Sequence, residues 1–399
     1  MASSIDSAAH TLDELLRQAL EQRASDIHFE SGENSFRVRF RIDGQLYIRA
    51  SPALSLRDAI ISRLKVQARM DIAEKRVPQD GRIQYRHDQD NVDLRVSSLP
   101  TVHGEKIVLR ILKFNRDHAS LSELGYEPSQ QIQLMHAIER PHGLVLMTGP
   151  TGSGKTVSMY SCLEHLNRPE INISTVEDPS EIHLPGANQV NIHPKAGLTF
   201  ANTLRALLRQ DPDVIMIGEI RDLETAEIAI QAAQTGHLVL STLHTNDAPG
   251  TLARLRHMGI PAFNVAASVS LVTAQRLVRR LCDLCKQPMR EADIQTFLSQ
   301  SLSQSDLQTL NTHHDRSPSL YQPVGCHTCD KGYKGRIGLY QVMPITHMLQ
   351  HLILRDSDTQ ALATQAAQEG VLTLRQAGWL KVWQGITSAK EIMAMTHHD

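Results

Sequence analysis

The sequence predicts an α/β protein with two domains, a small α+β domain followed by a larger domain built on a mostly parallel sheet. Mixed helix and strand signals fill residues 1–113. From residue 123 onward, helical segments alternate with short apolar strands. A glycine-rich loop, Gly149–Thr156, lies between one of these strands and the helix expected after it. A chain of 399 residues is long enough for two or three domains.

The first 113 residues show the pattern of a small α+β domain. Apolar residues at helical spacing between Leu12 and Arg23 predict an amphipathic helix, and a second helix is expected over Leu56–Ala68. Six further segments resemble strands: Asp26–Phe29, Phe36–Ile42, Gln45–Ile48, Gly81–Arg86, Val92–Val96 and Lys106–Leu112. A few helices among many strands favour an α+β arrangement. The polar residues 114–122 are expected to form a linker.

Residues 123–399 show a different pattern, in which helices alternate with apolar strands. The strands are expected over Leu144–Met147, Ile171–Val176, Val214–Ile217 and Leu238–Leu243. Continuous apolar runs are typical of strands buried on both faces, so a parallel sheet covered by helices is predicted. The polar residues 286–325 are interpreted as an excursion with a mobile loop over 301–319, and residues 344–399 as a helical tail.

Composition restricts the classes of function. The formal net charge of −2 creates no strong field for DNA or anionic lipid, and 4% aromatic residues offer few stacking platforms for bases. Neither a secretory signal nor an apolar run of membrane-spanning length is expected. Five cysteines without such a signal favour metal binding over disulfides. These features predict a cytosolic protein that binds no nucleic acid and does not insert into a membrane.

The glycine-rich loop predicts a nucleotide site. Backbone N–H groups of such a loop wrap a polyphosphate, and the helix that follows directs its positive dipole end toward it. Lys155 can reach the β- and γ-phosphates, and the Thr156 hydroxyl can bind Mg²⁺. A chance match is the alternative, but strand, loop and helix occur in register. The candidate nucleotide-binding residues are Gly149, Pro150, Thr151, Gly152, Ser153, Gly154, Lys155 and Thr156.

Two acidic residues follow apolar strands. Glu219 comes shortly after Val214–Ile217, and we expect its carboxylate at the sheet edge, in contact with Mg²⁺ through water. Glu177 follows another strand and could polarise an attacking water. Each has a simpler interpretation, since Glu219 could be a surface acid and the segment after Glu177 could be an ordinary turn.

Two histidines bracket the strand Leu238–Leu243. His237 and His244 are candidates for a hydrogen bond to the γ-phosphate. The chain has 20 histidines, so either one could equally be an ordinary structural residue.

Four cysteines form two Cys-x-x-Cys pairs, Cys282 with Cys285 and Cys326 with Cys329. Four thiolates complete a tetrahedral Zn²⁺ site without an open position, which predicts a structural metal. A redox role would need a thioredoxin-like pattern, which is absent. His327 is a conceivable substitute ligand, and Cys162 is expected to be a small buried residue.

The order of these segments resembles the secretion ATPase superfamily of type II secretion, type IV pilus assembly and conjugation. The loop, the two acidic strands and the histidine-bracketed strand correspond to its Walker A, Asp box, Walker B and His box. The branch of type II secretion and pilus assembly is more similar, on the segments Ala24–Glu30, Arg39–Gly44 and Arg205–Asp222. The resemblance extends from about residue 12 to the end of the chain.

This resemblance implies a cytoplasmic ATP-driven hexamer at the inner membrane, where it works with a membrane platform protein. Residues 1–113 would form a PAS-like domain and residues 123–399 a RecA-like ATPase domain, with ATP between them. Lys155 would hold phosphate, Thr156 and Glu219 would manage Mg²⁺, and Glu177 would activate water. Two arginines of the first domain, Arg82 and Arg95, would offset charge on the γ-phosphoryl group, although they could also be exposed strand residues.

The cysteine module, residues 278–340, also resembles the pilus-assembly and type II secretion branch, whereas retraction ATPases generally lack it. Many relatives have a further N-terminal domain that this chain is expected to lack, and Gln341 stands where they commonly have an acid. Two other functions stay open: a RecA-like nucleic-acid motor, and an assembly factor that binds ATP without hydrolysing it. The charge and the aromatic content argue against the first, and the intact acidic residues argue against the second.

Overall fold

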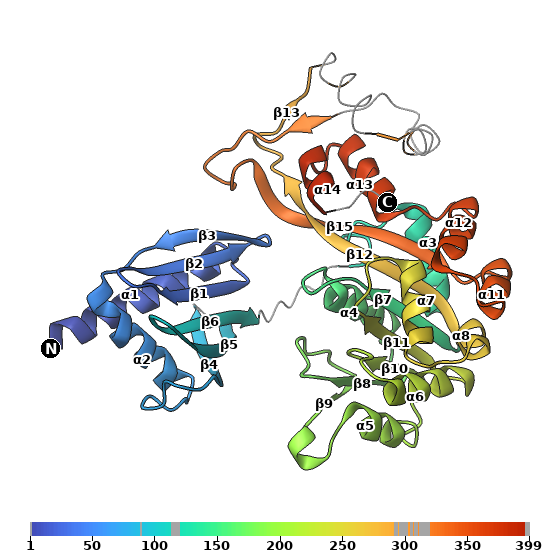
Figure 1. The fold of residues 1–399 in the computed structure, drawn as a ribbon, viewed down its shortest axis with the longest axis horizontal. Coiled ribbons are helices and arrows are strands. Elements are labelled where there is room, and N and C mark those ends of the chain that lie inside the picture. The colour runs from blue at the N-terminus through green and yellow to red at the C-terminus, as the bar shows by residue number, and fades with distance from the viewer. Residues whose placement is uncertain are drawn as a thin grey trace. The chain divides into compact units, whose positions relative to one another are not determined.

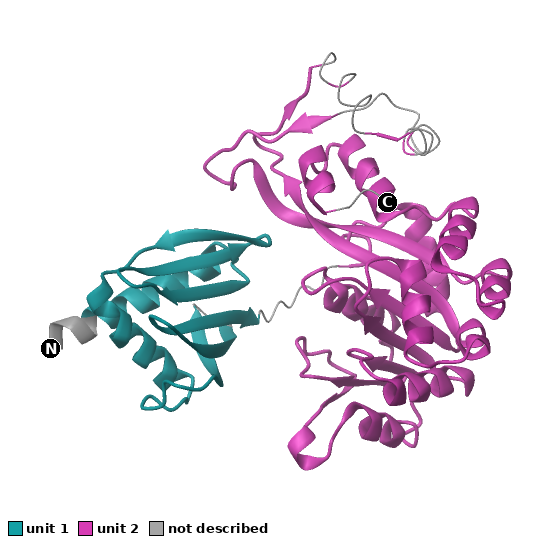
Figure 2. Ribbon diagram, in the orientation of Figure 1, with its two compact units in different colours: residues 1–116 teal, residues 117–399 magenta. Residues whose placement is uncertain are grey.

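The computed structural model describes residues 2–87, 90–112, 120–290, 294, 302–303, 306, 310 and 320–395. The chain divides into two compact units, residues 1–116 and 117–399 (Figure 2). Residues 114–119 of the expected linker and most of the expected loop at 301–319 lie outside the described residues. Each unit has its own sheet and its own apolar core.

Unit 1 is an antiparallel sheet with two helices (Figure 1). The strand order is β3-β2-β1-β6-β5-β4, and every neighbouring pair is antiparallel. The elements are α1 (Ala2–Glu21), β1 (Asp26–Ser31), β2 (Phe36–Ile42), β3 (Gln45–Ala50), a 3₁₀ turn (Leu54–Leu56), α2 (Arg57–Gln67), β4 (Gln79–His87), β5 (Asp90–Thr101) and β6 (Gly104–Leu112).

Alternation along the strands explains why both helices pack on one face of this sheet. Phe36, Val38 and Phe40 of β2 are buried, whereas Arg37 between them is exposed. Successive strand residues point to opposite faces, so one face is apolar and the other is charged. The apolar face joins the buried side of α1, including Leu12, in a single core.

Unit 2 contains a seven-stranded sheet in the order β15-β12-β7-β11-β10-β8-β9. All neighbouring pairs are parallel except β12 with β15. The strands are β7 (Gly143–Thr148), β8 (Ile173–Glu177), β9 (Asn188–Asn191), β10 (Val214–Ile217), β11 (Leu238–Leu243), β12 (Val269–Leu281) and β15 (Tyr333–Pro344). The four strands expected from apolar runs are β7, β8, β10 and β11, and their carboxyl ends lie at one edge of the sheet.

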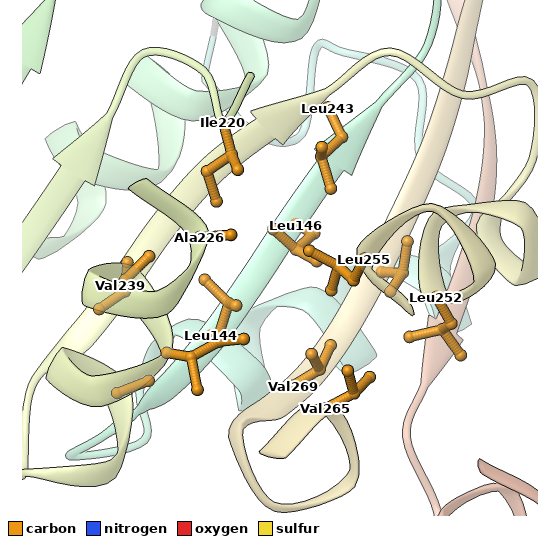
Figure 3. Packing of buried hydrophobic residues seen from close by; sticks show 14 of the residues in the cluster. Leu144, Leu146, Ile220, Ala226, Val239, Leu243, Leu252, Leu255, Val265 and Val269 are labelled. Carbon is orange, nitrogen blue, oxygen red and sulfur yellow. The ribbon is translucent and has the colours of Figure 1, made fainter. Parts of the chain in front are cut away.

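Helices cover both faces of the unit 2 sheet, which is why its central strands are apolar throughout. Leu144 and Leu146 of β7 face one core, shown in Figure 3 together with Leu252 and Leu255 of α7, and Val145 faces the other. The first core is covered by α5 (Phe200–Leu207), α6 (Leu223–Gln234), α7 (Ala248–His257), α8 (Ala262–Ser268), α11 (His347–Leu354) and α12 (Thr359–Gln368). The second is covered by α3 (Pro128–Ile138) and α4 (Lys155–Leu166).

Four helices lie in the C-terminal segment of unit 2 that the structure describes. Beyond α11 and α12, helices α13 (Leu374–Trp383) and α14 (Ala389–Met395) pack on β12 and β15 through a separate apolar cluster that includes Trp379. A short hairpin pairs β13 (Gln287–Pro288) with β14 (Tyr321–Gln322), and a 3₁₀ turn covers Pro194–Ala196. None of the helices in the described part of the chain has the length and apolar character needed to cross a bilayer.

Candidate nucleotide-binding and metal-binding sites

The glycine-rich loop connects β7 to α4 at the carboxyl edge of the sheet. Gly149, Gly152 and Gly154 have positive φ angles of 148°, 79° and 91°. A side chain at Gly149 would also meet the backbone carbonyl of Gln275, only 2.5 Å from an added Cβ. The loop therefore needs glycine at this position for both its conformation and its close packing. Pro150 and Thr151 are exposed, and Thr156 is half-buried in the first turn of α4.

Lys155 folds back over this loop. Its Nζ donates hydrogen bonds to the carbonyl oxygens of Gly149 (2.7 Å) and Pro150 (3.1 Å). Partial burial lowers the pKa of Lys155 to about 8, an effect that Glu219 opposes and Arg276 reinforces. A cation that is short of compensating negative charge is suited to bind an anionic ligand.

Gln275 of β12 makes a side-chain hydrogen bond to the loop. The sequence did not indicate this residue as part of the site. Its side chain is 1% exposed, and its Nε2 donates to the carbonyl oxygen of Ser153 at 2.9 Å. This residue lies 122 positions from Ser153 along the chain, so no local motif indicates the contact. Only the pairing of β12 with β7 could have revealed it.

Glu219 lies beyond the end of β10, within the electrostatic reach of Lys155. Its carboxylate pairs with Arg221 and lies 3.5 Å from Nε2 of His244. Hydrogen bonds between the main chain and Thr242 hold this segment beside β11: Thr242 Oγ1 donates to the Gly218 carbonyl at 2.7 Å. The structure therefore brings Lys155, Glu219 and His244 together at one edge of the sheet.

Threonine side chains connect the loop to the segment that follows β11. Thr148, the last residue of β7, donates to the Leu243 carbonyl (3.1 Å) and accepts from the Thr245 amide (2.8 Å). These two bonds fix the backbone on both sides of His244. The guanidinium group of Arg276 donates to the backbone carbonyl oxygen and to the side-chain oxygen of Asn246, both at 3.1 Å. Burial lowers the pKa of Arg276, with Asp247 opposing the shift.

Glu177 ends β8 in a buried polar network. It is 4% exposed, and its oxygens accept hydrogen bonds from Tyr160 (2.9 and 2.8 Å) and Thr175 (2.7 Å). Burial raises the pKa of Glu177, while the donated hydrogen bonds lower it. In this conformation the predicted water-activating carboxylate is enclosed by protein groups.

His237 and His244 lie at opposite ends of β11. Because β11 and β7 are parallel and in register, His244 follows the strand end beside the loop, whereas the main chain of His237 bonds to Gly143 at the start of β7. Six strand residues separate the two histidines, which places their Cα atoms about 23 Å apart. The His237 ring lies 3.0 Å from the Ala232 carbonyl. Within this chain, the structure does not bring His237 to the loop.

Arg82 and Arg95 belong to unit 1, where they stand directly opposite each other on β4 and β5. Their neighbours Ile83 and Leu94 are buried in the core, so the arginines lie on the helix-free face of the sheet. Arg110 of β6 is opposite Arg95 and binds Asp26 at 3.0 Å. The three arginines therefore occupy one row across the sheet. This alignment follows from the strand register and is not evident from the sequence.

The four cysteines converge although 40 residues separate the pairs. Their sulfur atoms lie within 4.8 Å of one another, with separations of 3.9 Å for Cys282–Cys326 and 3.6 Å for Cys285–Cys329. Tetrahedral zinc with Zn–S bonds of ~2.3 Å requires sulfur separations of about 3.8 Å. The donor set therefore fits a zinc ion, and it is the only such cluster among the described residues. Cys162 lies apart, fully buried in α4, where burial raises its pKa to about 12.

Backbone amides support the cluster. The Gly325 amide donates to the sulfur of Cys285 at 3.3 Å, and the Cys326 amide donates to the sulfur of Cys329 at 3.2 Å. Such bonds stabilise thiolates, which are the form that binds metal.

Comparison with known proteins adds to this geometry. Residues 2–394 match the family described as type II/IV secretion system protein. The type IV pilus assembly ATPase PilB of Acinetobacter baylyi is 53% identical over 390 residues, covering 96% of this chain and 66% of that protein. The type II secretion system ATPase E of Vibrio cholerae is 45% identical over 386 residues, covering 96% of this chain and 74% of that protein. The chain thus spans about two thirds of the length of the pilus assembly ATPase it matches.

Solved structures agree at the level of the fold. The X-ray structure of the Legionella pneumophila ATPase DotB has a TM-score of 0.68 and 20% sequence identity to this chain, covering 96% of this chain and 95% of that one. The mixed α/β fold predicted from the sequence is therefore confirmed. The family match covers residues 2–394, and the two relatives named above are 53% and 45% identical to this chain. The chain therefore belongs to the family of type II/IV secretion system proteins.

Proposed function

We propose that this chain is the ATP-hydrolysing subunit of a motor that drives type IV pilus assembly or type II protein secretion. One observation carries the proposal: the phosphate loop, Lys155, Glu219 and His244 gather at a single edge of the unit 2 sheet. A cradle of backbone amides, a cation and a carboxylate are the parts that phosphoryl transfer requires. The pilus assembly and type II secretion ATPases named above support the choice of process.

The phosphate groups are proposed to displace Lys155 from the loop carbonyls. The ammonium group would exchange its bonds to Gly149 and Pro150 for phosphate oxygens, which removes the shortage of negative charge around it. The Thr156 hydroxyl and the Glu219 carboxylate supply oxygen ligands of the type that Mg²⁺ prefers. When bound, Mg²⁺ would neutralise charge that develops on the phosphates.

Glu177 and His244 complete the proposed site in unit 2. Glu177 is assigned as the group that accepts a proton from the attacking water, and His244 as a donor toward the γ-phosphate. His237 lies at the other end of β11, so its assignment depends on the resemblance alone. Arg82 and Arg95 are assigned on the same resemblance, and they stand opposite each other on the charged face of the unit 1 sheet.

The finer architecture is part of the proposal. We assign residues 1–113 to a PAS-like domain, 114–122 to the linker and 123–399 to a RecA-like domain with a zinc module at 278–340 and a helical tail at 344–399. A parallel sheet with its phosphate loop at the carboxyl edge supports the second assignment. Zinc would cross-link the two cysteine pairs, and as a closed four-thiolate site it would stabilise the module without taking part in catalysis.

The proposed working form is a homohexamer at the cytoplasmic face of the inner membrane, coupled to a membrane platform protein. This assignment rests on the family and on the resemblance described above. Specific activity should then depend on protein concentration, since dissociation of the ring would separate subunits.

Phosphate release from Mg²⁺-ATP by the purified chain tests the proposal. Replacing Lys155 by Met should abolish turnover and nucleotide binding, because the loop loses its cation. Lys195→Ala is the matched control, since this lysine is exposed on the short turn at 194–196 and remote in sequence from the loop. Turnover that survives Lys155→Met, or a chain that neither binds nor hydrolyses ATP, would overturn the proposal.

A further inference from the structure

Tyr160, a buried residue of α4, contacts the carboxylate of Glu177. Tyr160 is 1% exposed, and its hydroxyl lies 2.9 and 2.8 Å from the two carboxylate oxygens. Thr175 donates a further bond to one of these oxygens at 2.7 Å. A tyrosine hydroxyl has one proton, so Tyr160 donates to the carboxylate and its own oxygen stays free to accept.

Gln189 of β9 satisfies that acceptor. Its Nε2 donates to the Tyr160 oxygen at 2.8 Å and to the Ile182 carbonyl at 2.8 Å, and its Oε1 accepts from the Leu184 amide at 2.8 Å. The network therefore runs from α4 through Tyr160 to Glu177, and through Gln189 to the segment between β8 and β9. All these partners are specific side chains or backbone groups, so the geometry of Glu177 is strongly determined.

We propose that Tyr160 is a positioning residue for ATP hydrolysis, which orients the Glu177 carboxylate and keeps it in the charged form that can take a proton from water. This inference rests on the proposed function, which assigns Glu177 that proton-accepting role. Tyr160 acts through Glu177 and has no assigned contact with the nucleotide.

Charge and position explain why such a residue is needed. Burial raises the pKa of Glu177, and the nearby Glu181 raises it further, whereas the bonds from Thr175, Tyr160 and Gln189 lower it. Burial and the adjacent Glu177 carboxylate raise the pKa of the Tyr160 hydroxyl, so it remains a donor throughout the working pH range. Tyr160 also lies on the helix that begins at Lys155, so a single rigid element carries both the phosphate-binding cation and the group that orients Glu177.

Tyr160→Phe tests the inference because it removes the hydroxyl and retains the ring. Without this bond the charged carboxylate loses stabilisation, so the pKa of Glu177 rises and more of it is protonated at neutral pH. We expect kcat to fall with KM changed less than about twofold, and the acidic limb of the kcat–pH profile to move upward by about one pH unit. Tyr340→Phe is the matched control: it removes a hydroxyl that donates to the Leu124 carbonyl in the same core, and it should leave the limb in place.

A double-mutant cycle with Glu177→Gln separates positioning from a merely structural role. Tyr160→Phe should cause no further loss of single-turnover rate in the Glu177→Gln background, because the group it acts through is already gone. An equal fold-loss in both backgrounds, or an unmoved acidic limb, would overturn the inference while the proposed function stands. Full turnover by Glu177→Gln itself would instead remove the assignment of Glu177 and the inference with it. If Tyr160→Phe does not fold, Gln189→Leu provides the same readout, with a smaller shift expected in the same direction.

Discussion

The support that Gln275 gives to the phosphate loop leads to a quantitative prediction. Gln275→Leu keeps the side-chain volume and removes the hydrogen bond from Nε2 to the Ser153 carbonyl. Both residues are almost fully buried, so the carbonyl would be left without a partner in a place that water does not reach. An unsatisfied buried acceptor costs about 1–3 kcal/mol.

This cost should appear in nucleotide affinity. The loop would relax to recover a partner for the Ser153 carbonyl, and nucleotide binding would then have to restore the phosphate-binding conformation. Since 1.4 kcal/mol corresponds to a factor of about ten, the Kd for ATP should rise roughly 5- to 140-fold. Titration of a fluorescent ATP analogue measures this change directly.

Gln130→Leu is the matched control for this measurement. Gln130 is also buried and donates to a carbonyl, that of Tyr340 at 2.7 Å, but it belongs to α3 and its hydrogen bonds go to Tyr340 and Glu127. Both variants should lower thermal stability, whereas only Gln275→Leu should weaken nucleotide binding. Equal affinities for the two variants would refute the reasoning that Gln275 organises the loop.

Three further predictions concern charge and metal. ATP affinity should decrease as the pH rises above about 8, because Lys155 has a pKa of about 8 in the free protein and loses its positive charge by deprotonation above that pH. Titration with ATP at several pH values checks this. Constant affinity up to about pH 9.5 would contradict it. Cys282→Ser should release zinc and lower the melting temperature, as read by metal analysis and calorimetry, and an unmodified protein without zinc would disprove the site. Lys65→Met should destabilise unit 1 by ~3–5 kcal/mol, because it leaves the buried Glu105 carboxylate without its charged partner. Glu105 is 4% exposed and lies 2.8 Å from Lys65 Nζ. Urea unfolding should show this loss of stability, and the double variant Lys65→Met/Glu105→Leu should recover it.

Much of the fold followed from local patterns in the sequence. Strands β7, β8, β10 and β11 were expected because uninterrupted apolar runs are suited to strands covered on both faces, and helices do cover both faces. β12 and β15 were not expected. They are long, β12 mixes arginines with apolar residues, and their pairing joins segments about 60 residues apart. Such a pairing leaves no periodic signal in either segment alone.

The candidate site divides in the same way. The glycines of the loop, Lys155, Glu219 and the cysteine pairs are recognisable because the required chemistry lies within a few adjacent residues. His237 and His244 look equivalent in sequence, since both flank one strand. Which of them lies beside the loop became apparent only from the direction of β11 relative to β7, because parallel strands place one flank at the loop and the other at the opposite edge.

By itself, the sequence determined which chemical groups are available and the local conformations of short segments: a phosphate loop before a helix, acidic residues after apolar strands, and four thiols in two pairs. Only the tertiary structure decided which of these groups meet. It placed Gln275 under the loop, joined Tyr160 to Glu177, and aligned Arg82 with Arg95 across two strands. The physical reason is that backbone preferences and periodicity act over a few residues, whereas strand order, register and side-chain contacts are set by packing between segments far apart in the chain.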